Sequence, residues 1–68
     1  MIVVQFAAEI KKTIRAEMND LADFVAGGGC TSIEHYRDIC GKIHGLATAE
    51  RMILDAAERL ERGNDDGN

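Results

Sequence analysis

Four side chains near the middle of the sequence are of the types that bind zinc. They are Cys30, His35, Cys40 and His44, and thiolate and imidazole are the common ligands of zinc. Cys40 and His44 would share one face of a helix, but His35 would point about 140° away from Cys40. The C-x4-H-x4-C-x3-H spacing also differs from the usual structural zinc patterns. We therefore expect no metal and no other cofactor, but a small buried thiol and two solvated histidines.

The two cysteines are poorly placed to form a disulfide. Ten residues separate Cys30 from Cys40. If a helix starts near Ser32, its rise of about 1.5 Å per residue takes the two Cα atoms beyond the ~7 Å limit of a disulfide. We expect reduced thiols, which are typical of the cytosol.

Glu50 is the one carboxylate that falls within the apolar stripe of a helix. A buried carboxylate can act as a catalytic base, but no nucleophile, phosphate loop or second paired carboxylate accompanies it. We expect Glu50 to pair with Arg15 or Lys11, or to lie at the edge of the stripe. The sequence thus predicts no catalytic residues and no enzymatic activity.

The first half of the sequence has the periodicity of an amphipathic helix. Apolar residues recur every three or four positions, which predicts a helix over about 5–26. Residues 2–4 are β-branched, so a short strand, a frayed end or an arm to a neighbour are alternatives there. The residues of this helix that we expect in the core are Ile10, Ile14, Met18, Leu21 and Val25.

A glycine-rich break over 27–31 separates this helix from a second one over about 32–62. Gly27 or Gly28 can take the positive φ of a helix C-terminus, and Thr31 with Glu34 fits a capping box. Residues 1–62 then form an antiparallel two-helix hairpin, all-α, with 63–68 as a flexible acidic tail. The core residues expected from the second helix are Tyr36, Ile39, Ile43, Leu46, Ile53 and Leu60, with Tyr36 anchoring the end near the turn.

A row of small residues follows the side of the second helix opposite its bulky stripe. It is made up of Gly41, Gly45, Ala49, Met52 and Ala56, at about 140–220° around the helix from Tyr36. Such a row permits close approach of another helix, so we predict an interface there. Alternatively, the glycines supply flexibility or admit a bulky side chain from the first helix.

Charge narrows the choice of partners. The net charge is −4, and the eight basic residues are scattered. A nucleic-acid binder needs a basic stripe, so we expect a protein partner and no direct nucleic-acid binding. The apolar start has no basic n-region and falls far short of the ~20 residues that span a bilayer, so we expect a soluble chain without a signal peptide.

The stretch from Phe24 to Glu50 resembles short open reading frames of tailed bacteriophages, encoded near virion-assembly genes. These have a helix, a glycine-rich break, and then Tyr-Arg-x-x-Gly-x-Ile-x-Gly-Leu-x-x-Ala. The matching residues are Gly27, Gly28, Tyr36, Arg37, Gly41, Ile43, Gly45, Leu46 and Ala49. The resemblance implies a genomic setting in which many copies of a hairpin line a shell, connector or tail.

Two functions are therefore compatible with the sequence. The first is a phage structural or assembly accessory, present in the virion or the host cytoplasm, that oligomerises or docks on a virion component. The second is a small acidic inhibitor of a host protein, because net charge −4 could engage a basic cleft. A dimeric regulator or adaptor built as a four-helix bundle is a further alternative.

Overall fold

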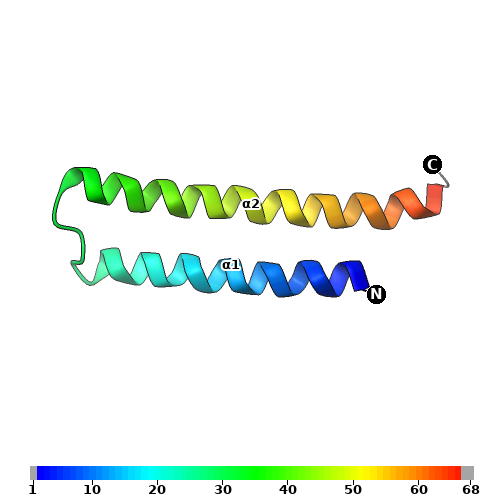
Figure 1. Cartoon of the computed structure of the whole chain (residues 1–68), viewed down its shortest axis with the longest axis horizontal. Coiled ribbons are helices and arrows are strands. Elements are labelled where there is room, and N and C mark those ends of the chain that lie inside the picture. Colours follow the sequence, from blue (N-terminus) through cyan, green and yellow to red (C-terminus); the bar gives the residue numbers. More distant parts are fainter. Residues whose placement is uncertain (1, 67–68) are drawn as a thin grey trace.

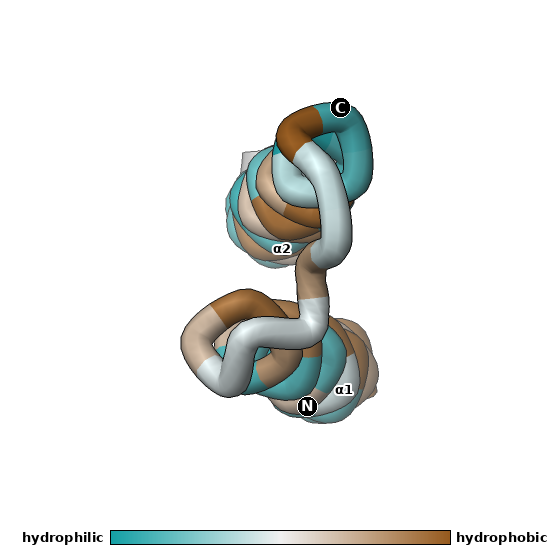
Figure 2. Tube along the Cα trace, turned by 90° about the vertical axis from the view of Figure 1, so that its left-hand side faces the viewer, coloured by the Kyte–Doolittle hydropathy of each residue, from teal (hydrophilic) through white to brown (hydrophobic). Residues whose placement is uncertain are grey.

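The two helices expected from the periodicity form an antiparallel hairpin. In the computed structural model, which describes residues 2–66, α1 spans Ile2–Ala26 and α2 spans Ile33–Asp66. The helices run side by side (Figure 1), and seen end-on they lie one above the other, joined by the turn (Figure 2). The predicted all-α hairpin is confirmed.

Both helices are longer than expected. α1 already begins at Ile2, so residues 2–4 are helical and not a strand or an arm. α2 continues through Gly63 to Asp66, so it runs past its expected end at about residue 62 and into the segment expected as a tail, whose residues 67–68 lie outside the described part of the chain. The helical hydrogen-bond ladder continues past a single glycine because one glycine costs only about 1 kcal/mol relative to alanine.

α1 ends in a Schellman motif. Gly29 N–H donates to the carbonyl of Phe24 (2.9 Å), and Gly28 N–H donates to that of Val25 (3.0 Å). Gly28 has a φ of +80°, which glycine adopts without the penalty that a Cβ brings. Of the two glycines that the sequence offered, Gly28 is thus the C′ residue.

Ser32, and not Thr31, caps the start of α2. Its Oγ accepts a hydrogen bond from the N–H of His35 (3.0 Å), and its carbonyl accepts one from Tyr36 N–H (3.0 Å). His35 therefore occupies N3 and Glu34 occupies N2, so the predicted capping box is wrong by one residue. Glu34 still lies in the first turn, where a negative charge is favourable.

The core is one residue layer thick. Ala7 and Ile39 are its buried apolar residues among those described. The remaining predicted core residues are half-buried between the helices: Ile10, Ile14, Met18, Leu21, Val25, Ile43, Leu46 and Ile53. Tyr36 and Leu60 were wrongly placed in the core, since 44% and 56% of their surfaces are exposed. Both lie at an edge of the stripe, where a single partner helix covers only one side of a side chain.

The hairpin is long and thin. It measures 53 × 18 × 10 Å, and its radius of gyration is 15.9 Å, whereas about 11 Å is usual for a compact domain of this length. α2 runs past the start of α1 at the open end of the hairpin (Figure 1). Within the described residues, neither helix has a stretch long and apolar enough to cross a membrane.

Candidate interaction surfaces

One polar link joins the middle of α1 to the middle of α2. Arg15 Nε donates to Glu50 Oε1 (2.9 Å), and Arg15 Nη2 donates to Glu50 Oε2 (3.1 Å). The Glu50 side chain is only 10% exposed, whereas that of Arg15 is 59% exposed. The hydrogen bonds from Arg15 lower the pKa of Glu50, and burial opposes them. The predicted pairing of Glu50 with Arg15 is confirmed. Lys11 forms no hydrogen bond with Glu50 and lowers its pKa only through its positive charge.

The potential zinc ligands are spread around the turn end of the hairpin. His35 is half-buried and packs edge-on against the ring of Phe24, with ring centroids 5.5 Å apart. His44 is exposed on α2. In the described part of the chain, no three His, Cys, Asp or Glu side chains gather closely enough to hold a metal.

Both cysteines are free, and neither is a buried thiol. Cys30 is half-buried in the turn, whereas Cys40 is exposed on α2. The expectation of a buried thiol is wrong, and so is that of two solvated histidines, since His35 is half-buried. His35 and not a cysteine fills the space beside Phe24. Tyr36 lies one turn from Cys40, and the neighbouring thiol raises the pKa of the phenol.

The two sides of the hairpin differ in the charged residues that border their hollows. On one side, which we call the charged flank, side chains of both signs border two grooves of about 420 and 430 Å³. The charged residues that line these grooves are Lys11, Arg15, Glu50, Arg51, Glu58, Glu61 and Arg62. Within this set Glu58 and Arg62 form an ion pair (3.4 Å). The four positive and three negative charges nearly cancel.

The opposite side carries what we call the apolar flank, at the open end of the hairpin. It consists of Val3, Phe6 and Ile10 of α1 with Ile53, Ala56 and Leu60 of α2. These residues surround a hollow of about 190 Å³ whose remaining lining is Ala7 and Ala57, so every lining side chain is apolar. A second hollow of about 220 Å³ adjoins it along α1 and shares Phe6 and Ile10, and its lining also includes Glu9, Thr13 and Ile14.

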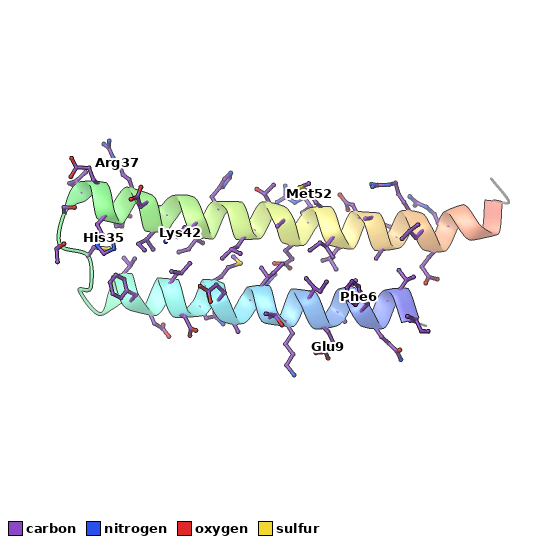
Figure 3. The ribbon with its side chains drawn as sticks, viewed as in Figure 1. Phe6, Glu9, His35, Arg37, Lys42 and Met52 are labelled. Atoms are coloured by element: carbon purple, nitrogen blue, oxygen red, sulfur yellow. The ribbon has the colours of Figure 1, made fainter. Side chains whose placement is uncertain are left out.

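The predicted interface is divided between two places. Gly41, Gly45 and Met52 form what we call the outer glycine face of α2. A Cβ on either glycine would meet nothing within 4 Å, and Met52 points away from α1 (Figure 3). The glycines therefore do not admit a side chain from α1. Ala49 and Ala56 are half-buried, and Ala56 belongs to the apolar flank.

Sequence reasoning gave no role to Phe6, the most prominent residue of the apolar flank, which is 65% exposed. A signal was present: Ile2, Phe6 and Ile10 recur every four residues beside the inner stripe, which widens the apolar face of α1 to one side only.

Comparison of the sequence with protein-family models, curated proteins and solved structures finds no significant match.

Proposed function

We propose that this chain is a non-enzymatic assembly protein, a phage-encoded structural or assembly accessory that works by binding other protein chains through its helix faces. The amount of surface that the hairpin leaves uncovered carries the proposal. A folded monomer of 7.4 kDa exposes about 4,200 Å², whereas this chain exposes 5252 Å². The excess of about 1,000 Å² is comparable to the area of about 800 Å² that each partner buries in a standard interface.

The distribution of this surface supports a binding role rather than a catalytic one. The hollow between α1 and α2 on the apolar flank is lined by apolar residues alone, and the adjoining hollow along α1 adds Glu9 and Thr13. The charged groups of the opposite flank are of both signs, and some of them form ion pairs. A catalytic site needs convergent polar groups in a concave pocket. Extended helix faces instead suit helix-on-helix packing.

The outer glycine face supports docking on a larger assembly. Gly41 and Gly45 lie one helical turn apart with open space above them, so the backbone of a neighbouring helix can approach α2 closely there. The resemblance to small phage proteins suggests that this neighbour is a virion component, of which a particle carries many copies.

The test is co-sedimentation of an epitope-tagged chain with particles of the phage that encodes it. We expect the tagged wild-type chain in the particle fraction of a density gradient. The tagged Gly41→Leu variant should be absent from that fraction, since a leucine would fill the outer glycine face. Lys12→Leu, on the outer side of α1, is the matched control and should co-sediment. A chain that stays at the top of the gradient, and that captures one host protein from uninfected cells, would instead support the inhibitor.

A further inference from the structure

We propose that the apolar flank is the interface of a homodimer in which two copies pack open end against open end, with their turns pointing in opposite directions. This inference rests on the proposed assembly function and names one partner, a second copy of this chain. Three observations on the described residues support it: the exposure of large apolar side chains, the lining of the hollow between α1 and α2, and the position of the acidic residues near the turn.

Two large apolar side chains of the flank are exposed. Phe6 is 65% exposed and Leu60 is 56% exposed, and they lie on opposite sides of one hollow. Among the described apolar residues, Ala7 and Ile39 are the buried ones. Two hairpins pressed flank to flank form a four-helix bundle, which gives the residues of each flank a second packing layer.

The chemistry of the flank suits a copy of the same acidic chain. Each copy has a net charge of −4, so association through charged surfaces is unfavourable. The hollow between α1 and α2 has no charged residue in its lining, whereas the grooves of the charged flank do. The hollow between α1 and α2 is therefore a surface over which two copies can meet without opposing like charges, and Glu9 lies beside it in the adjoining hollow.

The relative direction of the two copies follows from the residues nearer the turn. Glu17 follows Phe6 by eleven residues, three helical turns, and so continues the same edge of α1. Asp20 and Asp38 are exposed near the same end. If the turns pointed the same way, Glu17 and Asp20 of one copy would oppose Asp38 of the other. Pointing the turns in opposite directions overlaps the open ends and keeps these acids apart.

This arrangement sets a two-fold axis near Phe6 and Ala56, with each α2 packed antiparallel against the other. An isologous interface places the same residue on both sides of its axis. Ala56 then faces Ala56 of the second copy, where its small side chain permits close approach. Leu60, four residues further on, lies over the turn that holds Met52 and Ile53 of the second copy.

Sedimentation equilibrium of the full chain tests the dimer. We expect the dimer mass at about 50 µM, and we expect Phe6→Glu to weaken dimerisation at least about 30-fold, as the loss of a central interface residue does. Val4→Glu is the matched control, since Val4 is also exposed on the first turns of α1 (50%) but lies beside the other groove. A monomeric wild type, or equal weakening by both variants, would overturn the proposal.

A cysteine cross-link tests the direction of packing. In a chain with Cys30→Ser and Cys40→Ser, Ala56→Cys should form a disulfide-linked dimer under mild oxidation, whereas the exposed Thr48→Cys on α2 should not. Equal cross-linking of both, or none at position 56, would contradict the axis. If the chain dimerises but fails to co-sediment with phage particles, the result would support this interface and contradict only the proposed assembly function.

Discussion

Arg15 and Glu50 are joined by two hydrogen bonds, of 2.9 and 3.1 Å, across the middle of the hairpin. Among the described side chains, this is the one ion pair that links α1 to α2. Apolar packing between helices tolerates small shifts along the axis, whereas a bidentate pair requires both partners at defined positions. The pair therefore sets the register of α1 against α2.

A double-mutant cycle should show that the two residues are coupled. We expect Arg15→Met and Glu50→Gln each to lower the thermal midpoint of unfolding measured by circular dichroism, because each leaves a partner unpaired. The double variant should lose less than the sum of the two. Arg15→Lys should retain only part of the stability, since an ammonium group cannot donate in the same fork. Additive losses would show that the pair is not coupled.

The same pair predicts a dependence on acid. The hydrogen bonds from Arg15 lower the pKa of Glu50 below its ordinary value of 4.5. The pair is therefore fully stabilising above the ordinary value, and its contribution is lost as the pH falls through the lowered pKa. The thermal midpoint of unfolding should therefore drop more steeply for the wild type than for Glu50→Gln between about pH 5 and pH 2, when it is measured at intervals of about one pH unit. Glu17→Gln, at an exposed position, serves as the control and should keep the wild-type slope.

Ser32→Ala should destabilise the hairpin by about 1 kcal/mol, the usual contribution of an N-cap hydroxyl. Ser32 Oγ accepts the N–H of His35, which would otherwise lack a protein partner at the helix start. Thr31→Ala is the natural comparison and should change the free energy of unfolding by less than half as much. If Thr31→Ala proved the more damaging, the capping box drawn from the sequence would be right and the cap at Ser32 wrong.

The turn should be sensitive to alanine at two neighbouring glycines for different reasons. Gly28→Ala forces a Cβ into a φ of +80°, which costs about 1–2 kcal/mol. Gly29→Ala would place a methyl group 2.6 Å from Cδ1 and Cζ of Phe24, so the ring must leave its contact with His35. Nuclear Overhauser effects between these two rings should persist in Gly28→Ala and vanish in Gly29→Ala. Their survival in both would exclude the clash.

Gly41→Ala and Gly45→Ala should each stabilise the isolated chain by about 0.5–1 kcal/mol. Both positions are inside α2 and open to solvent, so alanine removes the backbone entropy cost of glycine and creates no clash. Urea unfolding at one chain concentration measures this gain. A loss of stability at either position would mean that another helix already packs closely there in the free protein.

Local signals in the sequence were sufficient for the helices and for part of their ends. The spacing of the apolar residues gives one face to each helix, and three consecutive glycines interrupt the pattern. The start of α2 was misplaced because Thr31 and Ser32 can both cap, and only the course of the chain decides which hydroxyl faces the free N–H groups. The extension of α2 to Asp66 was missed because glycine was taken as a stop signal, although one glycine inside a long helix costs little.

What the sequence alone determined is thus the hairpin, its inner stripe and the pairing of Glu50 with a basic residue of α1. Only the tertiary structure decided how the rest of the surface is divided. A helical wheel separates inner from outer residues, but it cannot tell which side of one helix adjoins which side of the other. That depends on the antiparallel register, which brings Phe6 and Leu60 together around one hollow and places the two grooves with charged borders on the other side.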